Sequence, residues 1–151
     1  MACAGMVVAL TGPALRLAVM SDYQKLQVWQ KAHALAIHAH RTATGVRATR
    51  YSALRSQIIR ASMSIPANIV EGRRQEGERD FARFLRYSLN SAYELEYHIT
   101  LARDIGVIPD ADTSSLIAEG VEVRKMLHGL LKKLGHTTEP SPDSSKSRTP
   151  L

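Results

Sequence analysis

The sequence predicts an all-α protein that folds as an antiparallel up-down four-helix bundle. Apolar residues recur every three or four positions in four successive segments, glycine or proline separates these segments, and no segment alternates apolar and polar residues as a strand would. The length of 151 residues suits a single domain. The one cysteine, Cys3, excludes an intramolecular disulfide and a cysteine-based zinc site.

We expect the bundle to occupy residues 21–135. Residues 1–20 are rich in alanine, valine and leucine, and they are too short and too interrupted to span a membrane. We interpret them as an N-terminal extension, non-native or disordered, ahead of a true start at Met20; the alternative is a weak targeting segment. Residues 136–151 contain three prolines and four serines, a composition typical of a disordered tail. We expect a cytoplasmic location.

The first two helices are expected over residues 21–44 and 49–71. Ser21-x-x-Gln24 fits a capping box at the start of the first helix. The second helix contains Pro66, which removes one backbone donor. Because the apolar spacing continues beyond this proline, we expect a kink there. Gly72 is expected to stop the helix before a short charged loop.

The third and fourth helices are expected over residues 78–105 and 112–134, with Asp112 as the N-cap of the fourth. Both follow the 4-3 spacing of a bundle helix that packs along one seam. The seam of the third helix consists of Phe81, Leu85, Ser88, Ala92, Leu95, Ile99 and Ala102. The seam of the fourth consists of Leu116, Gly120, Val123, Leu127, Leu130 and Leu134.

The positive charge is concentrated in one segment of the chain. Residues 41–86 hold ten arginines and four acidic residues, which gives +6, the same as the net charge of the whole chain. Arginine binds phosphate well because its planar guanidinium donates to two oxygens at once. Such a basic segment favours an anionic partner, nucleic acid first. The alternative is a solvated helical surface with no partner.

Five arginines are the candidate nucleic-acid-binding residues, and they lie at the loop between the second and third helices and along the start of the third. They are Arg73, Arg74, Arg79, Arg83 and Arg86. The last three share one helical face, offset from the Phe81/Leu85 seam. The alternative is that Glu76, Glu78 and Asp80 neutralise them locally. We expect no sequence-specific reading, because no aromatic platform or groove-reading helix is evident.

The sequence offers no convincing catalytic or metal-binding group. A di-metal carboxylate bundle needs Glu-x-x-His pairs on facing helices, and none is present. Glu94 and His98 lie one turn apart without a second half, and Glu119-x-x-Glu122 is a lone carboxylate pair. No glycine-rich phosphate loop or nucleophile elbow occurs. We expect a protein that is not an enzyme and has no cofactor or metal; a nucleotide-acting enzyme that uses Glu119 and Glu122 is a minor alternative.

Residues 54–72 carry the most informative motif. They resemble the signature of a bacterial four-helix bundle family that includes the intervening-sequence protein, whose members are encoded in insertions within large-subunit ribosomal RNA genes. The matching residues are Leu54, Gln57, Arg60, Ala61, Ser64, Ile65, Pro66, Asn68, Ile69, Glu71 and Gly72. Residues 23–33 resemble the first helix of the family, residues 84–85 and 91–96 its third helix, and residues 126–130 its last, so the similarity covers about residues 22–134.

The resemblance implies a bundle that assembles into a homopentamer. It also implies kinship with accessory proteins of diversity-generating retroelements, which are basic pentamers that bind reverse transcriptase and nucleic acid. For most members of the family the biochemical role is not established. The expected partners are therefore further copies of this chain, nucleic acid, and a reverse transcriptase or ribonucleoprotein.

A second set of residues forms a candidate structural or interface motif: Trp29, Gln57, Arg60, Ser64, Asn68, Glu71, Gly72 and Glu94. Arg60, Ser64, Asn68 and Glu71 are spaced 4, 4 and 3, so they share one polar stripe of the second helix. We expect Arg60 to pair with Glu94 across two helices in a partly buried position, because an unpaired buried charge is costly. The stripe would fix the bundle register or a subunit interface; the alternative is ligand binding.

Together these features predict a non-enzymatic, oligomeric helical bundle that binds RNA or DNA backbone through clustered arginines. It would act as an accessory to a ribonucleoprotein or a reverse transcriptase. The alternative is a protein–protein scaffold that docks an acidic partner and does not bind nucleic acid.

Overall fold

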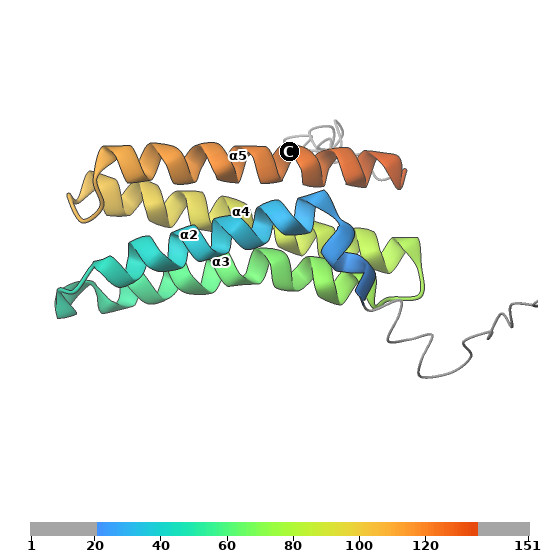
Figure 1. Ribbon diagram of the computed structural model, residues 1–151, viewed down its shortest axis with the longest axis horizontal. Helices are drawn as coiled ribbons and strands as arrows, with labels where there is room; N and C mark the ends of the chain where they lie inside the picture. Colours follow the sequence, from blue (N-terminus) through green and yellow to red (C-terminus); the bar gives the residue numbers. More distant parts are fainter. Residues whose placement is uncertain (1–20, 136–151) are drawn as a thin grey trace, which may run out of the picture.

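Four long α-helices make up most of the described part of the chain. The computed structural model describes residues 21–135, and helices without strands account for the regular structure in this range (Figure 1). In chain order the elements are the 3-10 helix η1 (Ser21–Lys25), α2 (Gln27–Gly45), the 3-10 helix η2 (Thr49–Tyr51), α3 (Ser52–Arg73), α4 (Glu78–Asp104) and α5 (Asp110–Lys133). The all-helical prediction is confirmed. The predicted extension over residues 1–20 and the predicted tail over residues 136–151 lie outside the described residues.

Each long helix packs against two others, so that the four enclose one core. α2 contacts α3 and α5, and α4 contacts the same two helices. The connections from α2 to α3 and from α4 to α5 lie at the left end of Figure 1, whereas the α3–α4 loop lies at the right end. The start of α2 and the end of α5 lie at that right end too.

All four long helices contribute to the core, and in α4 the core residues include those that heptad spacing selects. All seven predicted seam residues of this helix are buried, from Phe81 to Ala102. Ala82, Leu89 and Ser91 are buried beside them, because the long α4 also turns part of its flanks toward α3 and α5. On α2 the buried residues are apolar, and Trp29 beside them is partly buried and packs against the core.

The predicted starts of the first two helices were too early by several residues. The backbone of Leu26 is extended (φ −72°, ψ 118°), which separates η1 from α2, and no side chain caps α2. The predicted capping box therefore does not begin this helix. The ring of Tyr23 packs edge-on against Trp29 at a centroid distance of 4.9 Å, so the segment before α2 folds back onto it. A 3-10 turn likewise precedes α3.

α3 continues through Pro66 and past Gly72. The helix ends at Arg73, so the predicted stop at Gly72 was wrong. Gly72 is buried and does not have a positive φ; in the described residues only Gly106 and Gly135 do. One residue before Pro66, the Ile65 carbonyl accepts a bond from Ser88 Oγ of α4 at 2.9 Å, which joins the two helices.

α5 differs from its prediction at both ends. It begins at Asp110 after Pro109, and Asp112 lies in its first turn without acting as the N-cap. At the other end Leu131 is fully buried, whereas the predicted seam residues Leu130 and Leu134 are only partly buried. An α-helix has 3.6 residues per turn, so a strict seven-residue repeat drifts around it and the buried position moves by one residue. Among the helices of residues 21–135, none is long and apolar enough to cross a membrane.

Candidate nucleic-acid interface

The loop between α3 and α4 is short and is closed by hydrogen bonds among its own residues. The backbone N–H groups of Arg74 and Gln75 donate to the carbonyls of Glu71 and Gly72 at 3.1 Å each. Gln75 Nε2 also donates to the Glu71 carbonyl at 3.1 Å. These bonds satisfy carbonyl groups that a further helical turn would otherwise pair. They hold Arg73 and Arg74 in place at the end of the bundle.

The charges that flank this loop suit the ends of the two helices. α3 ends with Arg73, and α4 begins with Glu78 and Asp80 in its first turn. Cations are stabilised near the C-terminus of a helix and anions near its N-terminus. The arginines and carboxylates around the loop therefore stabilise the ends of the two helices, in addition to any functional role.

Gly72 allows the end of α3 to approach α4 closely. A Cβ atom added at Gly72 would lie 2.8 Å from Phe81 Cδ2 and 2.9 Å from Phe84 Cβ. The Arg73 guanidinium lies 5.5 Å from the centroid of the Phe81 ring, and that of Arg83 lies 5.5 Å from the Phe84 ring. Both distances suit cation–π attraction. The two phenylalanines thus connect the loop arginines with those of α4.

Most of the five arginines keep their charge uncompensated by neighbouring carboxylates. Arg83 Nη2 lies 3.2 Å from Asp80 Oδ1, in a pair whose side chains are about half exposed. Within residues 21–135, Arg74, Arg79 and Arg86 make no ion pair. Local neutralisation, the alternative raised by the sequence, therefore does not reach Arg74, Arg79 or Arg86 in this part of the chain, and the exposed pair at Arg83 is of a weak kind.

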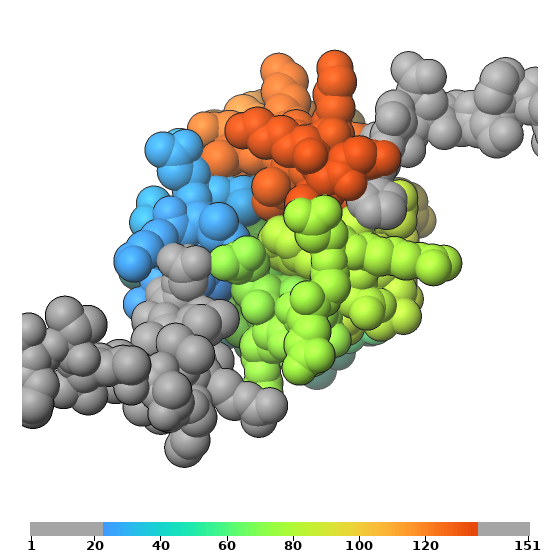
Figure 2. Space-filling view, turned by 90° about the vertical axis from the view of Figure 1, so that its right-hand side faces the viewer, coloured from blue at the N-terminus to red at the C-terminus, as the bar shows by residue number. Residues whose placement is uncertain are grey.

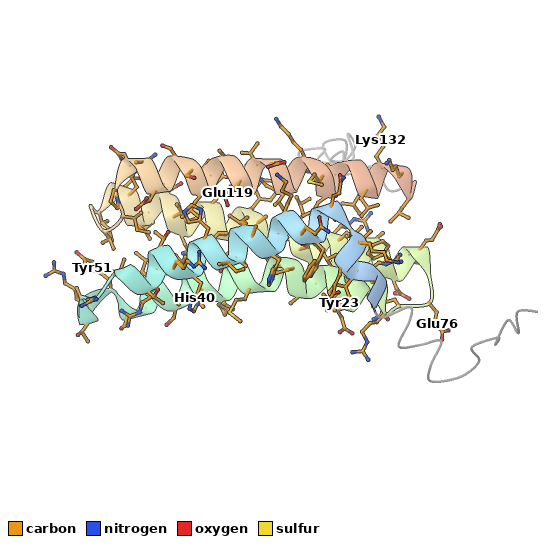
Figure 3. All side chains as sticks on the ribbon, viewed as in Figure 1. Tyr23, His40, Tyr51, Glu76, Glu119 and Lys132 are labelled. Carbon is orange, nitrogen blue, oxygen red and sulfur yellow. The ribbon has the colours of Figure 1, made fainter. Side chains whose placement is uncertain are left out.

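The arginines gather at one end of the bundle and continue along α4. Figure 2 views this end and shows the α3–α4 connection and the start of α4 next to the last turns of α5. α5 contributes Lys132 and Lys133 in its last turn. Figure 3 labels Glu76 and Lys132 at this end and Tyr51 at the opposite end. The structure thus adds two lysines that the sequence analysis did not connect with the arginines, because they are far apart in the chain.

The predicted pair between Arg60 and Glu94 is present, but it is more exposed than expected. Arg60 Nη2 donates to Glu94 Oε1 at 2.9 Å and to Gln57 Oε1 at 2.6 Å. The Arg60 side chain is 68% exposed and that of Glu94 40% exposed. The prediction of partial burial was therefore wrong for Arg60, since the pair lies at the solvent edge of the α3–α4 contact. His98 Nε2 lies 3.6 Å from the same Glu94 oxygen.

Ser64 and Asn68 of the predicted polar stripe lie deeper, near α4, than Arg60 does. Asn68 Nδ2 donates to the carbonyl of Ser64 at 2.8 Å, and Ser91 Oγ of α4 donates to Ser64 Oγ at 2.9 Å. Glu71 does not reach across to α4; its Oε1 accepts a bond from Gln75 within α3 and its loop. Trp29 is separate from this group, on α2, where its ring stacks on His33 at 4.9 Å.

The comparison with protein families identifies this arrangement of helices. The family model described as 23S rRNA-intervening sequence protein matches residues 24–129. The chain belongs to this family. The match spans α2, α3, α4 and most of α5. It includes all five candidate arginines and every residue of the candidate structural or interface motif. The resemblance noted from residues 54–72 is thereby confirmed.

A solved structure agrees with the membership in the intervening-sequence family. It is the crystal structure of a protein of unknown function from the S23 ribosomal protein family of Bacteroides thetaiotaomicron. The two chains are 26% identical and superpose with a TM-score of 0.66, over 70% of this chain and 98% of that one. No protein with a curated description matches this chain.

The structure also exposes aromatic residues that the sequence analysis of this intervening-sequence family member missed. Tyr87, Tyr93 and Tyr97 of α4 are 47%, 48% and 63% exposed. The signal in the sequence was the four-residue spacing of Tyr93 and Tyr97 outside the apolar seam, since residues in the seam face the core and residues opposite to it face solvent. An aromatic surface therefore lies on the same helix as Arg79, Arg83 and Arg86.

The described residues do not bring together a set of metal ligands. Within residues 21–135, no three or more histidine, cysteine, aspartate or glutamate side chains lie close enough to hold a metal ion. His38 Nδ1 lies 2.9 Å from Glu119 Oε1, and Lys31 Nζ lies 3.0 Å from Glu122 Oε1. The two carboxylates that the sequence analysis weighed for nucleotide chemistry are thus each engaged with a side chain of α2.

Proposed function

We propose that this protein binds the phosphate backbone of RNA or DNA through Arg73, Arg74, Arg79, Arg83 and Arg86, and that it does so without catalysing a reaction. The observation that carries the proposal is the gathering of these arginines at one end of the bundle, where Arg74, Arg79 and Arg86 make no ion pair within residues 21–135. Clustered guanidinium groups attract polyanions and bind phosphate oxygens in pairs. The family's name associates its members with intervening sequences of 23S rRNA, which agrees with an RNA partner.

The proposal includes an antiparallel up-down bundle that assembles into a homopentamer in the cytoplasm. Assembly would repeat the same five arginines around one particle. Because the affinity for nucleic acid rises with the number of neutralised phosphates, repetition would strengthen binding without any new contact within one chain. A particle of this kind suits an accessory role in a ribonucleoprotein or beside a reverse transcriptase.

Charge reversal on α4 tests the proposal. The variant replaces Arg79, Arg83 and Arg86 by glutamate in the full chain. The three arginines lie outside the buried seam of α4, so the fold should persist, and the helix content of the variant can be checked by circular dichroism. We expect binding to a structured RNA and to duplex DNA to be lost at about 150 mM salt.

A matched control changes the net charge equally at the other end of the bundle. Arg41, Arg47 and Arg50 are exposed and lie toward the end that Tyr51 marks in Figure 3. We expect their replacement by glutamate to retain most of the affinity. An equal loss in both triple variants would show a non-specific charge effect and would contradict the proposed location. Unchanged binding in the α4 variant would contradict the proposal outright.

The same arginines suit an acidic protein, which is the second candidate function. Two exposed apolar side chains near the end of α4 favour a protein partner: Leu101 is 37% exposed, and Ile105, the C-cap residue of the helix, is 46% exposed. Under this alternative the chain shows little affinity for polynucleotides near physiological salt and captures a defined partner. Competition between RNA and that partner for the α4 arginines would separate the two functions.

A further inference from the structure

The side of α4 that faces away from the core carries a second regular row of residues. Its members are spaced 4, 3, 4, 3, 4 and 4, so they line one outer face of the helix: Arg79, Arg83, Arg86, Asn90, Tyr93, Tyr97 and Leu101. The buried seam that begins at Phe81 lies on the opposite side. We call these seven residues the outer row of α4. It is cationic at its N-terminal end and aromatic toward its C-terminal end.

One tyrosine of the outer row, Tyr93, is held in place by a side chain of the neighbouring helix α5. The Arg124 guanidinium of α5 lies 4.5 Å from the centroid of the Tyr93 ring. Arg124 is itself paired with Glu96 of α4, and its side chain is only 15% exposed. The Tyr93 ring therefore rests on an ordered group while 48% of the residue remains exposed. Tyr97, one turn further along, is 63% exposed.

The carboxylates near these tyrosines are already paired with arginines. Glu94 pairs with Arg60 at 2.9 Å, and Glu96 pairs with Arg124. Asp104, near the end of α4, pairs with Arg103 at 2.8 Å. A polyanion that extends from the arginines toward the tyrosines would therefore meet compensated charges.

We propose that the outer row of α4 binds single-stranded nucleic acid, with Arg79, Arg83 and Arg86 at the phosphates and Tyr93 and Tyr97 stacked against bases. This inference rests on the proposed function and specifies its ligand. Exposed aromatic rings next to a basic surface bind single strands, because unpaired bases offer a free face for stacking. A duplex has its bases enclosed, so it can engage the arginines but not the tyrosines.

The length of the row sets the length of the strand. Tyr97 lies 18 positions after Arg79 in α4, and a helix rises about 1.5 Å per residue, so the part of the row from Arg79 to Tyr97 spans about 27 Å. A stacked strand rises about 3.4 Å per nucleotide, which corresponds to about eight nucleotides. A second copy of this chain is a poorer occupant, since the centre of a protein interface is usually depleted of charge and three of the seven residues are arginines.

The test compares single-stranded and duplex ligands for the full chain and two tyrosine variants. The ligands are an unstructured strand of about 12 nucleotides, as RNA and as DNA, and the corresponding duplexes, measured by fluorescence anisotropy. We expect Tyr93→Leu and Tyr97→Leu each to weaken single-strand binding about 5- to 150-fold, the usual range for one stacked base. Duplex affinity and the salt dependence should stay unchanged, because tyrosine carries no charge. Tyr97→Phe keeps the ring and should bind like the wild type.

Three outcomes would overturn the inference. Equal single-strand binding by the wild type and Tyr97→Leu would exclude stacking there, while the proposed function would stand if the Arg79, Arg83 and Arg86 reversal still abolished binding. A fall in the mass of the particle in Tyr97→Leu, measured by light scattering, would make this face a contact between copies. Absence of wild-type binding to every ligand would overturn both proposals. If Tyr93→Leu lowers the melting temperature of the protein, its binding is left out of the comparison, and the effect of Tyr97→Leu at the more exposed position tests the inference alone.

Discussion

Gly72 determines how closely the end of α3 can approach α4. A Cβ atom added at Gly72 would lie under 3 Å from atoms of both Phe81 and Phe84. The nearby atom of Phe84 is the Cβ of that residue, which is attached to the backbone and cannot move away by a side-chain rotation. Arg73, which follows Gly72, is held at the same contact, because its guanidinium lies against the Phe81 ring. Packing between these helices is thus linked to the position of the candidate interface.

Replacing Gly72 by alanine is expected to destabilise the protein by about 1–3 kcal/mol, since the two helices must move apart to admit the methyl group. Urea denaturation of the full chain measures the effect. Gly129→Ala is the matched control: nothing lies within 4 Å of its added Cβ, and alanine should stabilise α5 there by up to about 1 kcal/mol. A neutral Gly72→Ala would contradict the packing role.

Single residues show what sequence spacing can and cannot predict. The spacing of α3 predicted that Arg60 would reach Glu94, and the 2.9 Å contact confirms it. It did not predict the 68% exposure of Arg60, because burial depends on how far a helical face turns toward the solvent edge. Gly72 was expected to end a helix, whereas in the structure it allows close packing of α3 on α4. A glycine near the end of a helix suits either role, and the residues packed around it determine which role it has.

Among the helices, the bounds and the buried face of α4 were the most predictable from the sequence, and those of α5 were less predictable. α4 packs along its whole length against α3 and α5, so its 4-3 seam and its bounds followed from the sequence almost to the residue. In α5 the buried row moves from Leu127 to Leu131, where a strict heptad selects Leu130 and Leu134. The drift of an α-helix relative to a seven-residue repeat accounts for this difference.

The register of α5 can be measured by truncating its leucines. Leu131→Ala should cost about 2–5 kcal/mol, the usual range for a fully buried leucine. Leu134→Ala should cost distinctly less, because part of that side chain is already in water. Denaturant midpoints of the two variants compare them directly. A larger loss of stability in Leu134→Ala than in Leu131→Ala would contradict the observed register and support the heptad register that the sequence predicted.

For the candidate site, the positions of the arginines followed from the sequence and their surroundings did not. The sequence predicted that Arg79, Arg83 and Arg86 share a face, because helical spacing alone decides that. The nearby end of α5, with Lys132 and Lys133, and the stacking of Arg124 on Tyr93 are contacts between distant segments. Such contacts depend on the packing of whole helices, which a single sequence does not specify.

At the scale of the whole molecule, the proposed assembly can be tested without a ligand. Light scattering of the full chain is expected to give the mass of five chains across a range of concentrations. High salt should leave this mass unchanged if apolar and hydrogen-bonded contacts hold the copies together. The mass of a single chain at every concentration would contradict the homopentamer, and the phosphate contacts would then come from one copy.

The most direct test of the central claim is the affinity of the full chain for a structured RNA and a duplex DNA across a salt series. If the arginines of the α3–α4 region bind phosphates, the logarithm of the binding constant falls linearly with the logarithm of the salt concentration. The slope is about −0.9 for each phosphate neutralised on duplex DNA. Reversal of Arg79, Arg83 and Arg86 should make this slope shallower and abolish binding near about 150 mM salt. Absence of binding by the wild-type chain at that salt, or a slope that the reversal leaves unchanged, would contradict the account.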